Sequence, residues 1–331
     1  MLLESAFIEA IHETPDDRTL RLVYADWLDE TGDRRGELIR MQCELDELPV
    51  GNPQRTVLRQ AIHDVCSEHQ SEWLAPLRRR VLGWQKARFE FGLVDNVTMS
   101  PTAFLKHAEA GLFEEMPHLV GICLEGAETP MLKALSSPYL AKLTSLTLRI
   151  ISPPNTGSLI DCLASLKTTR NLASLNLADC RCGDTNIAVL LRSPNFPKLQ
   201  RLNLQNNSLT PWISQVLLHS PFLGQLKMLA LGSRWHWGHN RLEDLGVRAL
   251  TETSQPLELR WLDLVANNLS DSSGWDLVQS TAFPKLECLH LWGNDFGPAS
   301  RTALEARFSN RVFFSPCEPD CDCTQSDDFS F

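Results

Sequence analysis

The stretch Leu199–Leu204, which reads LQRLNL, decides the fold, because its spelling L-x-x-L-x-L occurs six times in the chain. The first leucines of the six copies are Leu143, Leu172, Leu199, Leu226, Leu259 and Leu286. They lie 29, 27, 27, 33 and 27 residues apart. A nearly constant period of this length predicts a solenoid, in which each turn is a short strand followed by a loop and a helix.

The residues after each strand support the same period. An asparagine follows the last leucine by three residues at Asn207, Asn267 and Asn294, and Cys180 takes this place in an earlier turn. We expect each inward Asn to bond backbone groups of its own bend and of the adjacent turn. The 33-residue step contains six extra residues around 233–238, after which Asn240 restores the pattern, so the insertion is predicted to be a surface loop.

The helix of each turn should bury an apolar stripe. The stripes that we assign to two of these helices are Trp212, Ile213, Val216 and Leu217 in one turn, and Trp275, Leu277 and Val278 in another. Two looser copies of the strand pattern begin at Val94 and Leu119, so the array is predicted to have eight turns. A degenerate first turn is expected, because one of its sides faces water.

The six copies, with Asn or Cys in the slot after each strand, resemble leucine-rich repeats of the ribonuclease-inhibitor type across roughly residues 119–312. The resemblance implies the α/β class: a right-handed horseshoe with a parallel sheet on its inner wall and helices outside. It also implies a binding module, since such solenoids present a broad concave surface.

The N-terminal segment carries a second resemblance. The run Tyr24-Ala25-Asp26-Trp27-Leu28, with Gly32-Asp33 shortly after it, is similar to the repeat-companion domain found before many bacterial leucine-rich repeats. The resemblance implies a small all-α unit, and it carries no assigned activity over to this chain. We predict a helical companion domain over 1–48, a helical connector over 49–92, the repeat array over 93–314 and a disordered acidic tail over 315–331.

The composition limits the class of partner that the chain is expected to bind. The formal charge of −10 over 331 residues argues against non-specific nucleic-acid binding, which needs basic surface. The sequence contains no run of about 18 apolar residues, so no membrane span is predicted, and no secretory signal is evident. The ten scattered cysteines are typical of reduced thiols. We therefore expect a cytoplasmic monomer that binds another protein and neither nucleic acid nor membrane.

Residues that alternate with the strand leucines should face the inner wall. Large aromatic side chains occur there only in the late turns, and the inserted loop adds two more nearby. Exposed aromatic clusters are the usual anchors of interfaces. The predicted partner-binding patch is Trp235, Trp237, Trp261, Asp263, His290 and Trp292, with Arg201 and Asn203 as polar neighbours that set the register. The alternative is that the loop and tail cover these tryptophans, with Phe329 and Phe331 inserted among them.

No catalytic or cofactor-binding constellation is evident. The sequence has no Gly-rich phosphate loop and no H-E-x-x-H or G-x-S-x-G motif. Cys288 and His290 lie on one strand face, but no oxyanion hole is apparent, so we predict no enzymatic activity. A competing hypothesis is a metal- or redox-responsive protein that uses the tail cysteines Cys317, Cys321 and Cys323 with His236 and His239. A fourth zinc ligand is not evident, so no metal site is predicted.

Overall fold

The fold is taken from a computed structural model, which describes residues 2–14, 17–48, 52–80, 84–116, 118–151, 157–233, 239–253 and 255–315. The chain divides into two compact units, one ending at Ile122 and the other beginning at Cys123. The predicted start of the array at residue 93 stays a prediction. The predicted tail lies outside the described residues from residue 316 onward.

Four helices open the first unit. They are α1 (Leu2–Glu13), α2 (Arg18–Glu30), α3 (Arg35–Glu47) and α4 (Pro53–Arg80). Helix α2 begins after Asp17, whose side chain accepts a hydrogen bond from the Leu20 amide. It ends before Gly32, where a φ of +78° confirms the left-handed conformation that the sequence predicts there. Tyr24 and Leu28 of α2 pack with Ile39 of α3 in a buried cluster.

Helices α2 and α3 approach closely and are bridged by charge. A side chain at Gly36 would place its Cβ 2.6 Å from the carbonyl oxygen of Ala25, so only glycine permits this approach. The Arg40 guanidinium of α3 contacts Asp26 at 2.6 Å and also pairs with Asp29 of α2. These ion pairs therefore bridge α2 and α3.

The first unit continues with a hairpin and two short helices. Strand β1 (Trp84–Glu90) pairs antiparallel with β2 (Leu93–Met99) through a two-residue turn. Helix α5 (Pro101–Glu109) starts after Ser100, whose side chain accepts from the Ala103 amide, and α6 (Leu112–Glu115) follows. The sequence predicts a strand at Val94–Met99, and β2 confirms it. The antiparallel β1 was not predicted.

The strands of the described chain form one ten-stranded sheet in sequence order. The strands after the hairpin are β3 (Gly121–Gly126), β4 (Ser145–Ile150), β5 (Ser174–Asn176), β6 (Arg201–Asn203), β7 (Met228–Ala230), β8 (Trp261–Asp263), β9 (Cys288–His290) and β10 (Val312–Phe313). From β4 to β10 every neighbouring pair is parallel. The sheet therefore belongs to the α/β class, in agreement with the coarse prediction.

The central leucines of the repeated spelling stand side by side across this sheet. In register, Leu146 pairs with Leu175, and the row continues through Leu202, Leu229, Leu262 and Leu289. All six have 0% exposure, so they form one continuous buried row. The sequence prediction that these leucines align is confirmed.

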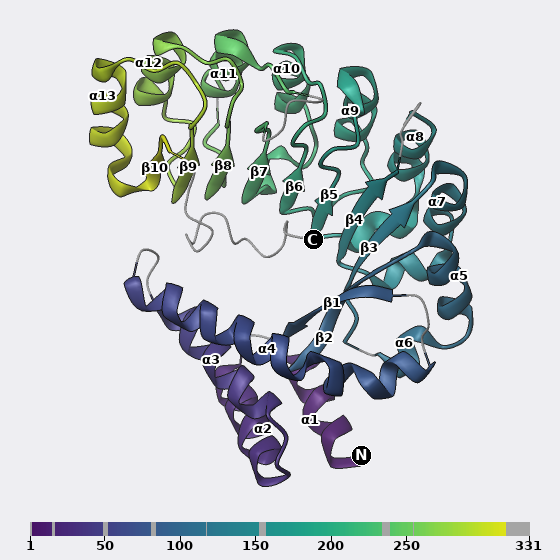
Figure 1. The fold of residues 1–331 in the computed structure, drawn as a ribbon. Coiled ribbons are helices and arrows are strands. Elements are labelled where there is room, and N and C mark those ends of the chain that lie inside the picture. The colour runs from purple at the N-terminus through teal and green to yellow at the C-terminus, as the bar shows by residue number, and fades with distance from the viewer. Residues whose placement is uncertain are drawn as a thin grey trace. The chain divides into compact units, whose positions relative to one another are not determined.

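Helices connect the strands of the second unit and lie along one side of them (Figure 1). They are α7 (Glu128–Leu135), α8 (Gly157–Ser165), α9 (Gly183–Leu191), α10 (Trp212–Leu218), α11 (Glu243–Thr251), α12 (Asp271–Gln279) and α13 (Pro298–Phe308). The 3-10 turns are η1 (Pro138–Lys142), η2 (Lys167–Asn171), η3 (Leu223–Gln225) and η4 (Ser309–Arg311). None of the described helices is both long and apolar enough to cross a membrane.

Two predicted helix stripes need correction. Trp212 and Trp275 are 44% and 42% exposed, whereas Ile213 and Leu217 of α10 and Leu277 of α12 are buried. Residues 213, 216 and 217 are buried positions of α10, whereas Trp212 is the first residue of the helix and remains exposed. Both tryptophans are therefore surface residues of the outer helices.

The asparagine slot links successive turns as predicted. Asn240 accepts from the backbone amides of Asn207 and Leu209 at 2.9 and 3.0 Å, and donates to the carbonyls of Leu204 and Leu231 at 2.9 and 2.8 Å. Ser233 accepts from the Asn240 amide at 2.8 Å, which ties together the two ends of the inserted loop. Asn207, Asn267 and Asn294 make equivalent bonds.

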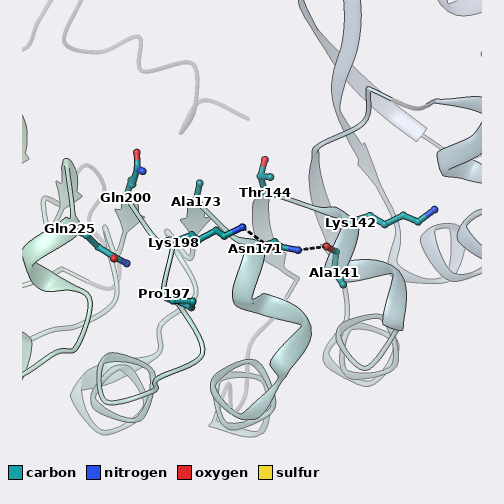
Figure 2. A pocket seen from close by; sticks show the side chains of 9 residues that line it. All are labelled: Ala141, Lys142, Thr144, Asn171, Ala173, Pro197, Lys198, Gln200 and Gln225. Atoms are coloured by element: carbon teal, nitrogen blue, oxygen red, sulfur yellow. Dashed lines mark hydrogen bonds between the residues drawn. The ribbon is translucent and has the colours of Figure 1, made fainter. Parts of the chain in front are cut away.

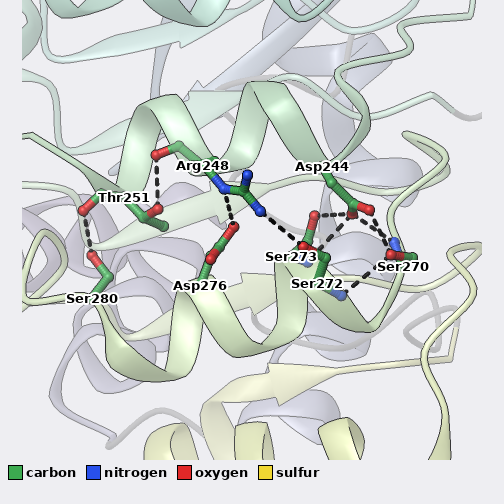
Figure 3. Close-up of polar contacts among 8 residues, drawn as sticks. All are labelled: Asp244, Arg248, Thr251, Ser270, Ser272, Ser273, Asp276 and Ser280. Carbon is green, nitrogen blue, oxygen red and sulfur yellow. Dashed lines mark hydrogen bonds and ion pairs between the residues drawn. The ribbon is translucent and has the colours of Figure 1, made fainter.

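A second ladder joins the outer helices (Figure 3). The Asp244 carboxylate of α11 accepts from the Ser270 amide at 2.9 Å and from the hydroxyls of Ser270 and Ser273. Arg248 contacts Asp276 of α12 at 3.2 Å. These contacts cross from one turn to the next, so they add polar bonds to the apolar packing between turns.

Candidate functional site

The predicted partner-binding residues lie on the late strands, as far as they are described. Trp261 and Asp263 are the first and third residues of β8, and His290 is the third residue of β9. Arg201 and Asn203 hold the same positions in β6. Because side chains alternate along a strand, all of these point to one face of the sheet. Trp235 and Trp237 lie outside the described residues.

These aromatic side chains are less exposed than the sequence prediction requires. Trp261 is 7% exposed and His290 only 2%, while Trp292, which follows β9, is partly exposed. The His290 ring lies 5.4 Å from the ring of Trp261 and stacks on Phe313 of β10 at 5.2 Å, with 19° between the planes. Neighbouring strands place these rings side by side, so they bury one another. An exposed aromatic patch centred on Trp261 and His290 is therefore corrected to a packed row.

Asn203 and Asp263 have an internal task that the sequence prediction missed. The Asn203 side chain accepts from the Gln205 amide at 3.0 Å, and the Asp263 side chain accepts from the Val265 amide at 2.8 Å. Asn176 does the same for Ala178 at 3.0 Å. A short polar side chain that bonds the amide two residues on closes a bend. The sequence signal for this role was the Asn or Asp at the third strand position, just before each bend.

Asp263 also reaches sideways across the sheet. Its carboxylate accepts from the side-chain amide of Gln205, on the turn after β6, although β7 lies between them. Gly232, just after β7, makes room for this bond, since a Cβ there would lie 2.7 Å from Cγ of Asp263. Asp263 is 0% exposed, and its buried carboxylate accepts hydrogen bonds from Gln205 and from the Val265 amide of its own turn.

Cys288 and His290 are close enough to interact. Sγ of Cys288 lies 3.1 Å from Nε2 of His290, and the thiol-bearing residue is 8% exposed. A thiol beside an imidazole can give up its proton to it, which is the first requirement of a cysteine nucleophile. Asp263 stands opposite His290 in the register. The absence of enzymatic activity stays a prediction.

The metal- or redox-responsive alternative depends on segments that are not described. Cys317, Cys321, Cys323 and His236 lie outside the described residues, whereas His239 is described and partly exposed. Within the described part of the chain, no group of three or more Cys, His, Asp or Glu side chains could hold a metal ion. In that part, Cys43, Cys123, Cys180, Cys182 and Cys288 are buried, and Cys66 and Cys162 are partly exposed.

The described side chains form a hollow in each of the two units. The first, of about 420 Å³, lies at the start of strands β4 to β6 and is lined by Lys142, Asn171, Lys198, Gln200 and Gln225 among others (Figure 2). The second, of about 400 Å³, lies between α2, α3 and the β1–β2 turn. There Arg18 pairs with Glu47 at 3.0 Å, and the Arg21 guanidinium lies 3.4 Å from the ring centre of Phe91. Sequence reasoning singled out neither hollow.

Comparison with protein-family models and with curated proteins finds no match for this chain.

Proposed function

We propose that the second unit is a leucine-rich repeat solenoid of the ribonuclease-inhibitor type, preceded by a repeat-companion domain. The aligned row from Leu146 to Leu289 supports this fold, and so does the asparagine slot that recurs from Asn207 to Asn294. In this proposal the sheet is the concave wall of a right-handed horseshoe and the helices are its outer layer.

We further propose that the protein is a non-enzymatic scaffold that binds another protein on this sheet face. The observation that carries the proposal is a row of three side chains at the first position of adjacent strands: Arg201, Met228 and Trp261. Arginine, methionine and tryptophan are the residue types that protein interfaces favour. Arg201 and Met228 are partly exposed, as is Trp292 beyond β9.

The burial of Trp261 defines how this surface would work. At 7% exposure its ring contributes support more than contact area, because it packs against His290. Contact with a partner would therefore come from Arg201, Met228 and Trp292 around it. A surface that is already ordered loses little side-chain entropy when a partner binds, which favours affinity.

The proposal includes a cytoplasmic location and a monomeric state. The cytoplasmic location is supported by the ten cysteines, whose scattered positions in the sequence are typical of reduced thiols. Neither point is needed for the binding surface, and each has its own measurement: cell fractionation for location and light scattering for mass.

Site-specific crosslinking tests the binding surface. A photoreactive phenylalanine derivative placed at Met228 or Trp292 should capture a defined protein from an extract of the source organism. The same group at Trp212 or Trp275, which are exposed on the outer helices, is the matched control. Capture that is equal at all four positions, or confined to the outer helices, would refute binding at the sheet face.

Substitution gives an independent readout. Arg201→Ala and Trp292→Ala should each weaken partner capture, while Trp275→Ala should leave it unchanged. If the sheet-face variants bind as well as the native chain, the proposed surface is wrong even if a partner exists.

A further inference from the structure

Strand β9 carries a cysteine whose thiol is in contact with a basic side chain. Sγ of Cys288 lies 3.1 Å from Nε2 of His290, two residues further along the strand. Both side chains project from the same face, because alternate residues of a strand share a face. A thiol reacts as its thiolate, and a neighbouring imidazole that takes the proton raises the fraction of thiolate at neutral pH. The pair therefore has an arrangement that makes a cysteine reactive.

Aromatic rings on the two neighbouring strands hold the imidazole in place. The His290 ring stacks on Phe313 of β10, with ring centres 5.2 Å apart and 19° between the planes. Trp261 of β8, on the other side of β9, lies 5.4 Å from the same ring. At 2% exposure the imidazole has little room to turn, so its Nε2 stays beside the Cys288 thiol.

The charged groups next to this pair are a carboxylate and a guanidinium. Asp263 of β8 is 0% exposed and stands opposite His290 in the register. Adjacent strands lie about 4.8 Å apart, so a buried carboxylate at this place favours a positive charge on the imidazole. On the β10 side the charged residue is Arg311, whose guanidinium donates to two backbone carbonyls. The surroundings therefore favour a proton on His290.

Exposure decides which reagents can reach the thiol. Cys288 is 8% exposed, compared with 0% for Cys123 and Cys180 and 2% for Cys43. Trp261 pairs with Cys288 in the register, so its ring narrows the approach to the sulfur. A compact electrophile fits this approach better than a bulky one. Hydrogen peroxide is such an electrophile, and thiolates attack it to give a sulfenic acid.

We propose that Cys288 is a modification site that hydroperoxides oxidise to a sulfenic acid, with His290 as the proton carrier. The Cys288 thiolate attacks one oxygen of the peroxide, so an S–O bond forms while the O–O bond breaks. The proton held by His290 passes to the departing oxygen, which leaves as water from hydrogen peroxide or as an alcohol from an alkyl hydroperoxide. The sulfur is oxidised and the peroxide is reduced. The reaction needs no partner protein, so the proposal goes beyond the scaffold function.

Timed oxidation of the reduced full-length protein tests this site. Hydrogen peroxide is added at pH 7 and removed with catalase, and the chain is then unfolded in urea that contains dimedone, which tags sulfenic acids. Mass spectrometry of the digest gives a rate for each cysteine. We expect Cys288 to be oxidised about tenfold faster than the partly exposed Cys162, because an ordinary thiol is only a few per cent thiolate at this pH. Equal or slower oxidation of Cys288 would overturn the proposal.

The pH profile separates a thiolate–imidazolium pair from an ordinary thiol. N-acetylcysteine should react about a hundredfold more slowly at pH 6 than at pH 8, since its thiolate fraction falls about tenfold per pH unit. For Cys288 we expect a decrease of about threefold at most, because His290 already holds the proton. A Cys288 rate that follows the N-acetylcysteine profile would reject the pair.

Matched histidine variants assign the role of the imidazole. His290→Gln removes the proton acceptor, so oxidation of Cys288 at pH 6 should slow about tenfold. His219→Gln changes an exposed histidine at the end of α10 and should leave the rate unchanged. A native rate in His290→Gln, or an equal loss in the two variants, would contradict the role of His290. Thermal unfolding shows whether His290→Gln folds, and if it does not, the pH profile of the native chain decides.

Discussion

Replacement of Asn240 by alanine probes the bond pattern that carries the repeat across its inserted loop. The native side chain satisfies four buried backbone groups, namely the amides of Asn207 and Leu209 and the carbonyls of Leu204 and Leu231. Each bond contributes about 1 kcal/mol net, and an orphaned buried group can cost more. The four together predict a loss of about 4 kcal/mol in the free energy of unfolding.

Urea denaturation followed by circular dichroism measures this loss. A decrease of about 4 kcal/mol is a large part of the 5–15 kcal/mol that a typical domain has, so the midpoint should fall clearly. Asn186→Ala is the control, because the Asn186 side chain donates a hydrogen bond of 2.7 Å to the Cys182 carbonyl within its own turn. We expect that control to lose about 1 kcal/mol.

The result that would refute the reasoning is a loss for Asn240→Ala no larger than that of Asn186→Ala. Equal losses would mean that the turns on either side of the loop do not depend on the asparagine bonds. The inserted loop would then be joined to the array by apolar packing alone, and the slot would carry no special weight in the fold.

Four other outcomes follow from the contacts described above. Gly232→Ala should destabilise the protein by about 2–3 kcal/mol in the same urea assay, because the added Cβ would displace the buried Asp263 carboxylate from Gln205. The control is Gly224→Ala, since a Cβ at Gly224 meets nothing within 4 Å. Desolvation acts to raise the pKa of Asp244, but hydrogen bonds from Ser270 and Ser273 outweigh it and hold that pKa below 3.8. Its stabilisation is therefore present above about pH 4 and lost as pH falls through the folded pKa, so Asp244→Asn should lower Tm slightly at pH 7, and the difference should shrink as the pH falls below 4. Asn203→Ala should lower Tm without changing the affinity of a partner, and Arg201→Ala should do the reverse; the opposite pattern would contradict the assignment of Asn203 to the bend. Burial raises the pKa of Cys66 to about 11, so its alkylation by iodoacetamide at pH 8 should be about a hundredfold slower than that of an ordinary thiol with a pKa of 9.0, as read by mass spectrometry.

The strand row and the asparagine slot could be predicted from the sequence because their signals repeat. Leu175 and Leu202 occupy equivalent positions in successive turns, each one residue before the side chain that closes the bend. When a pattern recurs several times, a local exception in one copy does not hide it. Asn240 was recoverable despite the insertion because its bonds need a fixed position relative to the strand rather than a fixed residue count.

Strand β1 and the turn that joins it to β2 were missed because they break that period. That turn, Phe91-Gly92, has φ of +46° and +75°, which is the left-handed pair that a tight two-residue hairpin requires. The available signal was Gly92 at the second position of a two-residue turn between two segments with strand propensity. We overlooked it because the repeat pattern predicts a helix, and not a second strand, next to each strand. Local turn chemistry therefore carries information that repeat counting loses.

Trp212 and Trp275 were placed on the buried faces of their helices because the sequence did not identify which helix face packs most closely against its neighbour. Gly274, one residue before Trp275, comes so close to α13 that its Cβ would lie 3.1 Å from Cβ of Ser300. The inward line of α12 thus runs through Gly274 and Leu277, and Trp275 is turned outward to 42% exposure. An apolar residue count cannot separate a large inward side chain from a small one, because hydrophobicity alone does not report how close two helices approach.

The candidate site could be predicted only in part, because the first and third positions of each strand have different roles. At the third position, Asn203 and Asp263 direct their oxygens to the bend, which removes them from the surface. At the first position no bend needs closing, so Arg201 and Met228 can vary in chemistry without loss of the backbone pattern. In the proposed scaffold, a partner would therefore be recognised by first positions such as Met228, whereas the side chains at the third positions stabilise the bends. Recognition by this chain should be sought where the fold leaves side chains unassigned.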